Sequence, residues 1–266
     1  MGINDSKEWG RLFKNGVKTV ENKINIMDVP VDYITMEQAV SRVMSFFETT
    51  GCHSVYTPNP EIIMAAQKDK ALMKALHHAS LIVPDGIGVV LASRLLKGPS
   101  LPERVAGYDL VQNLFARMAS TDYTVYFLGG APGVTEEAAI AMSNKYKGLK
   151  IVGTDHGYFK EADEEAVIKR IQEAKPDLLL VGLGAPKQEK WIEKYRKILP
   201  AKACIGVGGS FDVMAGKVKR APVAFQKLGL EWFYRLITQP TRAKRMLQLP
   251  VFAWEVLKIS AKNKDK

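Results

Sequence analysis

The sequence from residue 56 to residue 88 begins YTPNPEIIMAAQ and ends SLIVPDGIG, and this stretch decides the fold. Short β-type runs lie at its two ends, Ser54–Thr57 and Leu81–Val83, and each is followed by a polar turn. Helix-forming sequence connects them, from Pro60 to about His78. A strand, a helix and a second strand at this spacing are typical of a right-handed crossover in a parallel sheet.

Consecutive parallel strands deliver their following loops to one edge of an open α/β sheet, and ligands bind there. We therefore expect four residues of these loops to share one crevice: Thr57, Asn59, Asp85 and Gly86. Asp85 could be a general base that takes a proton from an attacking hydroxyl, or a simple turn former at a strand end. Thr57 and Asn59 could hydrogen-bond a sugar, although Asn59 could instead cap the next helix.

Alternation of strands and helices continues along the chain and predicts an α/β, Rossmann-like fold, in which a mostly parallel sheet carries helices on both faces. A β-hairpin or edge strand is expected at 24–34, followed by a helix over 36–49 that Thr35 caps. The helix expected at 87–96 reads as buried. Later strands are predicted at 124–128, 149–153, 177–181 and 203–207, with helices at 135–147, 162–174 and 187–199 between them.

The composition of the 266-residue chain, 47% hydrophobic and 25% charged, is that of an ordinary globular protein. No apolar run approaches the ~20 residues of a membrane-spanning helix, and the N-terminus lacks the apolar core of a secretory signal. Cys52 and Cys204, the only cysteines, are expected to be buried reduced thiols, which favours a cytosolic protein. The four histidines lack metal-ligand spacing, so we expect no metal.

Charge is concentrated at one end of the chain. Residues 215–266 hold twelve lysines and arginines against three acids, a net of +9 of the total +10, which leaves about +1 for the rest. This division predicts a lead-in at 1–22, an α/β catalytic domain at 23–219 and a small helical C-terminal appendage at 220–266, basic and aromatic, with helices broken at Pro240 and Pro250.

The appendage places aromatic side chains beside cations, a combination that suits a membrane surface rich in anionic lipid. Trp232, Phe233 and Tyr234 precede Arg235, and further basic residues follow Pro240. The same residue types could bind nucleic acid by stacking and phosphate contacts, or could form the solvated face of a helix packed on the domain. We favour a membrane surface as the partner.

Three glycine-rich turns follow predicted strands: FLGGAPGV (127–134), VGLGAPKQEKW (181–191) and IGVGGSFDVMAG (205–216). Glycine lets the backbone approach a ligand closely, and a helix N-terminus offers unpaired N–H groups to phosphate oxygens. Together these turns predict a nucleotide or sugar-nucleotide site. Its candidate residues are Gly129, Gly130, Gly184, Gly208, Gly209 and Asp212.

Six motifs occur in order: YTPNPE, PDGIGVV, RVAGYDL, FLGGAPGV, GLGAPKQEKW and GGSFDVMAGKVKRAP. With them the chain resembles the WecG/TagA/CpsF family of glycosyltransferases (glycosyltransferase family 26) over roughly residues 24–245. The resemblance implies an inverting transferase, without cofactor or metal, that moves a sugar from a UDP donor to polyprenyl-diphosphate-linked N-acetylglucosamine. The length and basic C-terminus most resemble the wall-teichoic-acid branch. In that branch the donor is UDP-N-acetylmannosamine and the product is a β-1,4-linked disaccharide on undecaprenyl diphosphate.

The resemblance also implies roles for particular residues. The base of the family corresponds to Asp85, and its pocket residues correspond to Thr57, Asn59 and Gln188. The appendage would contact the inner face of the bacterial cell membrane and close the site, bringing arginines to the diphosphate. The matching positions are Arg235, Arg242 and Arg245.

Two other classes of protein fit parts of the sequence. A nicotinamide-dependent oxidoreductase also uses glycine turns, but no complete GxGxxG precedes an acidic residue ~20 positions later. A nucleic-acid-binding module would suit the tail, but the nearly neutral body argues against it. The sequence leaves open a related donor, such as the uronic acid UDP-ManNAcA. It also leaves open a homo-oligomer, because apolar surface around the tail could contact a second subunit.

Overall fold

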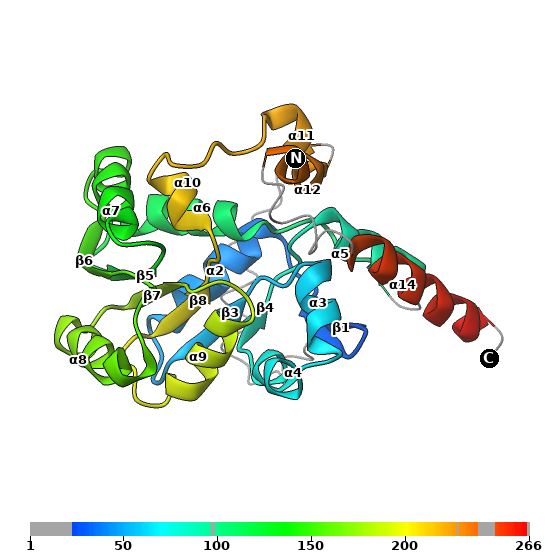
Figure 1. Cartoon of the computed structure of the whole chain (residues 1–266), viewed down its shortest axis with the longest axis horizontal. Coiled ribbons are helices and arrows are strands. Elements are labelled where there is room, and N and C mark those ends of the chain that lie inside the picture. The colour runs from blue at the N-terminus through cyan, green and yellow to red at the C-terminus, as the bar shows by residue number, and fades with distance from the viewer. Residues whose placement is uncertain (1–22, 97–98, 228, 239–247, 265–266) are drawn as a thin grey trace, which may run out of the picture.

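The computed structural model describes residues 23–96, 99–227, 229–238 and 248–264, so the predicted lead-in at 1–22 lies outside the described residues. Within these ranges six strands form one sheet in the order β4-β3-β8-β7-β5-β6, and every neighbouring pair is parallel (Figure 1). The strands are β3 (His53–Tyr56), β4 (Leu81–Ile82), β5 (Thr124–Gly129), β6 (Lys150–Asp155), β7 (Leu178–Gly182) and β8 (Ala203–Gly206).

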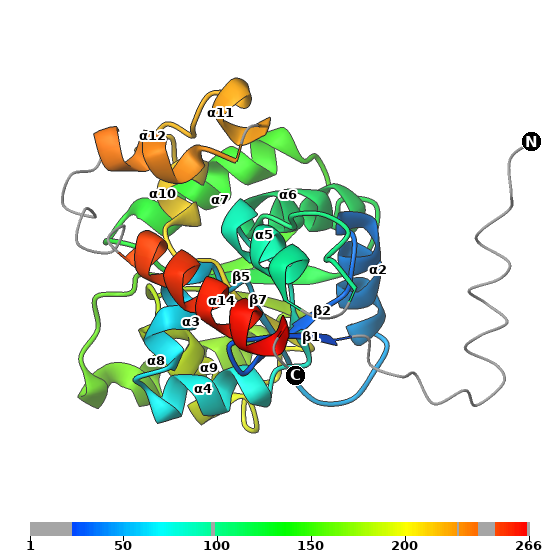
Figure 2. The same cartoon turned by 90° about the vertical axis from the view of Figure 1, so that its right-hand side faces the viewer.

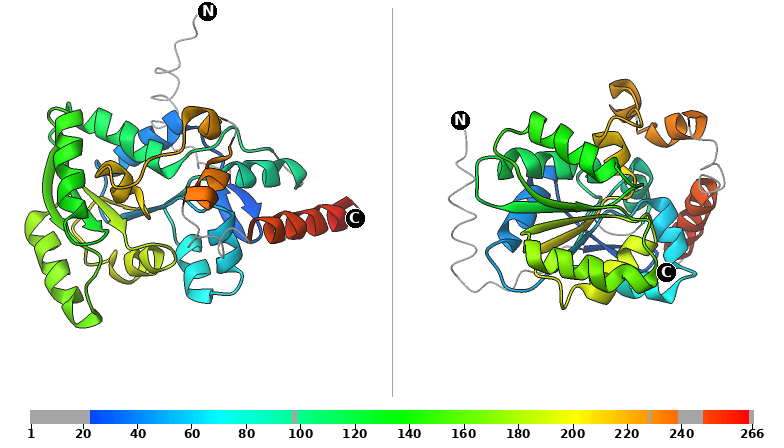
Figure 3. Two further views of the ribbon diagram at one scale, coloured as in Figure 1. Left: turned by 45° about the horizontal axis from the view of Figure 1, so that its top comes forward. Right: turned by 60° about the vertical axis from the view of Figure 1, so that its left-hand side comes forward.

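Helices cover both faces of this sheet, as Figure 3 (right) shows, and the predicted α/β class is confirmed. One face packs on α2 (Met36–Phe46), α6 (Gly107–Met118), α7 (Val134–Lys145) and α10 (Ser210–Met214). The other packs on α3 (Pro60–Ala66), α4 (Lys70–His77), α5 (Ile87–Leu95), α8 (Glu164–Ala174), α9 (Lys187–Tyr195) and α14 (Gln248–Lys264). Every residue of β7 is buried, as expected for a strand with a helical layer on each side.

The predicted hairpin is confirmed. Strands β1 (Lys23–Ile26) and β2 (Val29–Asp32) pair antiparallel around Met27 and Asp28, which both have positive φ. Its apolar residues pack into the core beneath α4 and α5. The carboxylate of Asp32 accepts a hydrogen bond from the backbone N–H of Ile82 at 2.7 Å, so the hairpin is tied to the edge strand β4.

The prediction of continuous helical sequence from Pro60 to His78 is wrong in one respect: the chain forms two helices there, α3 and α4. The break lies at Asp69, whose carboxylate accepts from the backbone N–H groups of Ala71 and Leu72 at 3.1 Å each. An aspartate in this position starts a new helix, because it satisfies N–H groups that would otherwise lack acceptors. The first helix is therefore only seven residues long.

The C-terminal segment forms helices α11 (Val223–Lys227), α12 (Glu231–Thr238) and α14, and the fold prediction of a helical C-terminal part is confirmed. Helix α14 lies across α3 and α5 (Figure 2), with Phe252 and Val256 buried. The prediction that Pro250 breaks a helix is wrong: Pro250 lies in the first turn of α14, where its missing N–H leaves no bond unmade. Pro240 lies outside the described residues.

Strands β3 and β8 are adjacent at the centre of the sheet although they are far apart in the sequence. The sulfur atoms of Cys52 and Cys204, 152 positions apart, lie 3.0 Å from each other, and both residues are free cysteines. Cys204 is buried as expected, whereas Cys52 is only half-buried. The separation of the two cysteines in the sequence did not indicate that their thiols would lie next to each other.

Candidate active site

The two loops that the sequence analysis placed together do pack against each other. Strands β3 and β4 are parallel neighbours, and the backbone N–H of Val83 donates to the carbonyl of Tyr56 at 3.0 Å. A Cβ atom added to Gly88 would lie 2.8 Å from Cγ of Pro60, and one added to Gly86 would lie 3.6 Å from Cδ of Pro60. The PDGIG turn therefore lies directly on the TPNP turn at the carboxyl edge of the sheet.

Asp85 follows β4 at this edge and is half-buried. The next residue, Gly86, has φ +91° and is the N-cap of α5. Asp85 consequently lies one residue outside the N-terminus of a helix, where the helix dipole favours a negative charge. A half-buried carboxylate at the carboxyl edge of a parallel sheet is chemically able to accept a proton from a bound hydroxyl group.

Thr57 lies in the wall of the same crevice, against α6. A Cβ atom on Gly107 would come within 2.9 Å of Oγ1 of Thr57, so only glycine fits there without moving the threonine. The backbone N–H of Val105 donates to the carbonyl of Pro84 at 2.8 Å. The RVAG segment is thus fixed beside both Thr57 and the PDG turn, a role that sequence reasoning missed.

Asn59 serves as a helix cap, one of the two roles left open by the sequence. Its side-chain oxygen accepts from the backbone N–H of Ile62 at 3.0 Å, and Pro60 occupies the first helical position of α3. The carbonyl of Asn59 also accepts from Ile63 N. This cap fixes the orientation of the TPNP turn relative to Asp85.

The strands at the other end of the sheet finish in glycines whose backbones touch. A Cβ atom on Gly129 would lie 2.4 Å from the carbonyl oxygen of Gly182, and one on Gly182 would lie 2.9 Å from that of Gly208. Gly157, after β6, approaches Cα of Gly129 in the same way at 3.1 Å. We call these four residues the glycine floor. Gly129 and Gly182 are themselves buried, and the ring of Phe211 lies against Gly182, so a ligand would meet the half-buried turns beside them, at Gly130, Gly184 and Gly208.

Hydrogen bonds tie the loops of the glycine floor together. Gly130 N donates to the carbonyl of Gly182 at 3.1 Å, and Gly157 N donates to the carbonyl of Gly130 at 2.8 Å. Strands β5 and β7 are neighbours whose connections lead in opposite directions along the sheet, from β5 through α7 to β6 and from β7 through α9 to β8. Open α/β sheets bind ligands at such a switch point.

The other predicted nucleotide-binding residues lie in the loops beside the floor. Gly184, and Gly208 of the floor itself, have φ of +75° and +52°, conformations that favour glycine. Gly209 is the exposed N-cap of α10, and Asp212 is a half-buried residue within that helix. Gly157 and Gly182 were missed by sequence reasoning, although each stands at or just after the end of a predicted strand.

Gln188 is buried beneath these loops. Its Oε1 accepts from Gly208 N at 2.9 Å, and its Nε2 donates to Oε1 of Glu189 at 2.9 Å. The side chain lies flat against the end of β8, where a Cβ atom on Gly206 would be 2.7 Å from Nε2. In this structure the amide of Gln188 therefore holds the turn after β8.

The site as a whole is a row along one edge of the sheet. Asp85 follows the edge strand β4, whereas Gly129 ends β5, and four strand spacings separate these strands, about 19 Å. Thr57 after β3 and Gly208 after β8 lie between them. The row has an acid, Asp85, at one end and half-buried glycine turns at the other. This arrangement suits an extended ligand with an anionic part.

Four charged side chains fasten the C-terminal segment to this edge. The carboxylate of Glu231, at the start of α12, accepts from Arg104 at 3.0 Å, and Arg220 makes a bidentate pair with Asp109 at 2.6 and 2.7 Å. Between α11 and α12, Gly229 approaches Cβ of Ile87, the first residue of α5. Helix α12 is thereby held close to the PDG turn. Bidentate arginine–carboxylate pairs are among the stronger polar contacts in proteins.

The predicted arginines are only partly described. Arg235 lies on α12, whereas Arg242 and Arg245 lie outside the described residues. Within the described part of the chain, no three or more His, Cys, Asp or Glu side chains are grouped so that they could hold a metal ion.

Helices α5, α12 and α14 expose apolar side chains around the Asp85 end of the sheet, and we call these side chains the apolar face. They are Leu91, Leu95, Trp232, Phe233, Ile237, Val251, Trp254 and Leu257. Helix α5 was expected to be buried; it exists as predicted, but Leu91 and Leu95 are nearly half exposed. Among the described helices, none combines the length and the apolar character needed to span a bilayer.

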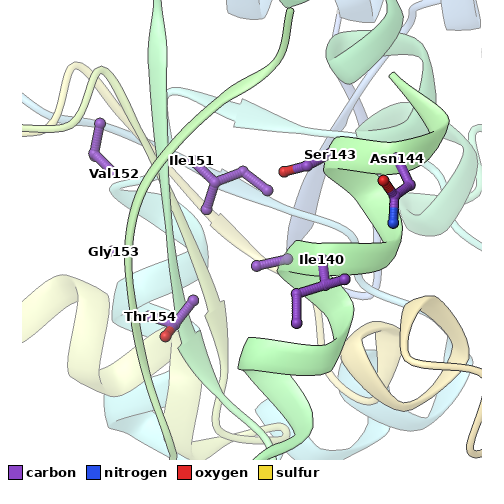
Figure 4. Close-up of a pocket in the computed structure, with 8 residues that line it drawn as sticks. Ile140, Ser143, Asn144, Ile151, Val152, Gly153 and Thr154 are labelled. Carbon is purple, nitrogen blue, oxygen red and sulfur yellow. The ribbon is translucent and has the colours of Figure 1, made fainter. Parts of the chain in front are cut away.

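A shallow depression of about 460 Å³ lies away from these residues, between α7 and the edge strand β6 (Figure 4). Ile140 and Val152 line it, together with Ser143, Asn144 and Thr154. Strand β6 is the edge opposite β4, so this depression is separate from the row that begins at Asp85. None of the residues predicted for the site lines it.

Residues 24–266 match the family described as the Glycosyl transferase WecG/TagA/CpsF family. The chain is 44% identical over 210 residues to the N-acetylglucosaminyldiphosphoundecaprenol N-acetyl-beta-D-mannosaminyltransferase of Bacillus subtilis (strain 168), covering 79% of this chain and 80% of that one. It is 37% identical over 244 residues to the protein of the same name from Staphylococcus aureus (strain MRSA252), covering 91% and 95%. The chain therefore belongs to the WecG/TagA/CpsF family of glycosyl transferases.

Proposed function

We propose that this protein transfers N-acetylmannosamine from UDP-N-acetylmannosamine to the C4 hydroxyl of the N-acetylglucosamine in GlcNAc-diphospho-undecaprenol, an early step of teichoic acid linkage-unit synthesis. The observation that carries the proposal is the row of Asp85, Thr57 and the glycine floor on one edge of the sheet. It occurs in a chain whose relatives carry the name of this transferase.

The donor fits the glycine end of the row. The diphosphate of a UDP-sugar is anionic and needs close contact with backbone groups and helix N-termini. Half-buried glycine turns lie beside the glycine floor at the β5/β7 switch point, at Gly130, Gly184 and Gly208, and α7 and α9 begin just beyond it. With the nucleoside at the β5/β7 end, the diphosphate would run along the edge past the Gly208–Gly209 turn after β8, and the anomeric carbon would come to β3, beside Asp85.

The acceptor fits the Asp85 end. The C4 oxygen attacks the anomeric carbon of the donor, the bond from that carbon to the diphosphate oxygen breaks, and the proton of the hydroxyl moves to the carboxylate of Asp85. A single displacement of this kind inverts the configuration and needs no protein nucleophile. We propose that three arginines stabilise the departing diphosphate: Arg235, Arg242 and Arg245. In support, Gly229, just before α12, lies against Ile87, the first residue after the PDG turn and its glycine cap.

The lipid carrier of the acceptor is proposed to reach the site from a membrane surface. The apolar face on α5, α12 and α14 lies at the Asp85 end of the sheet, since α5 begins directly after the PDG turn. Trp232 and Trp254 in this face suit the interfacial region of a bilayer. We therefore propose peripheral binding to the inner face of the bacterial cell membrane.

Mass spectrometry of the product tests the reaction. The protein is incubated with lipid-linked N-acetylglucosamine and either UDP-N-acetylmannosamine or the corresponding uronic acid UDP-ManNAcA. We expect the mass of one N-acetylhexosamine to be added only with the first donor. Addition of the uronic acid alone would assign the other donor, and no addition with either would refute the proposal. Calorimetric titration with UDP and with NAD gives an independent check, since only UDP should bind.

Replacing Gly107 with alanine is expected to lower kcat/KM about 10-fold or more, because the new Cβ would lie 2.9 Å from Oγ1 of Thr57 and displace that side chain. Gly107 is in the first turn of α6 and its φ is not positive, so alanine suits its backbone. The melting temperature should hence stay near that of the wild type. Unchanged kcat/KM would mean that the position of Thr57 does not matter for the reaction.

A further inference from the structure

Glu189 is an acid in an unusual place. It lies in the first turn of α9, where acidic side chains normally face solvent, yet it is only 1% exposed. Tyr56, whose hydroxyl bonds the backbone of Glu189, is also buried. Within the described chain, no lysine, arginine or histidine nitrogen lies within 4 Å of its carboxyl group. Burial raises the pKa of Glu189, which favours the neutral acid.

A chain of hydrogen bonds links this acid to the turn after β8. Gly208 N donates to Oε1 of Gln188, and Nε2 of Gln188 donates to Oε1 of Glu189, at 2.9 Å in each case. The direction of the chain is fixed, because a backbone N–H can only donate. The oxygen of the amide must therefore face Gly208, and its NH₂ group must find an acceptor on the other side. Glu189 supplies that acceptor.

The geometry leaves the amide of Gln188 little freedom. It lies on the end of β8, where a Cβ atom at Gly206 would be 2.7 Å from Nε2. Glu189 is also connected to β3, since the hydroxyl of Tyr56 donates to the backbone carbonyl of Glu189 at 3.2 Å. Tyr56 directly precedes Thr57. Glu189 is thus linked to the ends of two strands that carry the candidate site, directly to β3 and through Gln188 to β8.

We propose that Glu189 is a positioning residue of the donor site: by accepting from Gln188 it orients the amide that holds the Gly208–Gly209 turn in the conformation that receives the UDP-sugar. The proposal rests on the proposed function in naming the UDP-sugar as ligand. Glu189 itself touches neither substrate, and its contribution is the orientation of Gln188. A neutral residue at this position that can accept a hydrogen bond should therefore keep Gln188 in the same orientation.

Two variants at this position separate positioning from simple packing. Glu189→Gln retains an oxygen acceptor and the shape of the side chain, whereas Glu189→Leu removes the acceptor. The matched control is Glu193→Leu, one turn further along α9, where the acid pairs with His78 and Arg196 and, among the described residues, is not hydrogen-bonded to Gln188. The readouts are hydrogen exchange of the Gly208 amide, measured by NMR, and the Kd for UDP, measured by calorimetry.

We expect Glu189→Gln to match the wild type in both readouts. In Glu189→Leu the Gly208 amide should exchange at least 10-fold faster and the Kd for UDP should rise about 10-fold, the loss expected when one hydrogen bond that fixes a binding loop is removed. Turnover at saturating donor should change less than KM. Glu193→Leu should leave exchange of Gly208 and UDP affinity unchanged.

If Glu189→Leu does not fold, a second variant tests the same proposal. Gly206→Ala displaces the same amide while Glu189 remains, and its backbone φ is compatible with alanine. A Gly208 amide that stays protected in Gly206→Ala or in Glu189→Leu overturns the proposal, as does unchanged UDP affinity in both variants. A wild-type protein that does not bind UDP would instead refute the proposed function, a result visible without any variant.

Discussion

Replacing Asp85 with asparagine is expected to lower turnover by ~10²–10⁴-fold, the usual contribution of a general base. Asparagine has the same shape but cannot take the proton of the acceptor hydroxyl. Binding of the UDP-sugar should be retained, because the glycine floor is about 19 Å away along the sheet, at the end of β5. The measurement is single-turnover transfer to lipid-linked N-acetylglucosamine, with donor affinity determined separately by calorimetry.

The control is Asp69→Asn. Asp69 lies between α3 and α4, outside the site, and pairs with Lys190 on α9. Asparagine is an equally good helix cap, so turnover should remain within about twofold. Near-normal turnover by Asp85→Asn would remove Asp85 from the mechanism. Loss of donor binding together with turnover would mean that the PDG turn belongs to the nucleotide end of the site.

Placing glutamates at Trp254 and Leu257 is expected to weaken binding to vesicles of anionic phospholipid by about 100-fold, on the order of 2–3 kcal/mol of apolar burial. Both residues are exposed on α14, on the side away from the buried Phe252 and Val256. Turnover of lipid-linked acceptor in vesicles should fall with binding. Turnover of a short-chain, water-soluble acceptor should not change, because neither residue belongs to the row at the sheet edge.

Ile140→Glu is the matched control. Ile140 is 65% exposed, close to the 60% of Trp254, but lies on α7 beside the opposite edge strand. Its replacement should leave vesicle binding unchanged. If Trp254→Glu with Leu257→Glu binds vesicles normally but changes the oligomeric state in analytical ultracentrifugation, the apolar face is a subunit contact and the membrane proposal is wrong.

The sequence predicted the sheet, and the edge of it that carries the candidate site, because both depend on periodicity and turn residues. Thr57 and Asp85 each follow a strand, and they could be placed together from the rule that the carboxyl ends of parallel strands lie at the same edge of the sheet. The contacts of Pro60 with Gly86 and Gly88 agree with this placement. The break at Asp69 was missed because capping by one carboxylate outweighs helix propensity on both sides of it.

Other features depend on pairing between distant residues and could not be predicted. Nothing near Gly182 in the sequence indicates that its carbonyl touches Gly129, and nothing near Glu231 indicates its contact with Arg104. The partial exposure of α5 depends on how α14 lies across it, since the helix carries leucines on its exposed side as well as valines on its buried side. Such contacts follow from the strand order, which local sequence does not encode.

The central position of β8 has a consequence for synthesis on the ribosome. β3 is the first strand of the parallel sheet to leave the exit tunnel and β8 is the last, yet they hydrogen-bond to each other. Until β8 emerges, the nascent chain holds two separate pieces, β4-β3 and β7-β5-β6, with the acid on one and the glycines on the other. Pairing over so long a separation is slow, so the enzyme acquires its activity only in the last stage of its production.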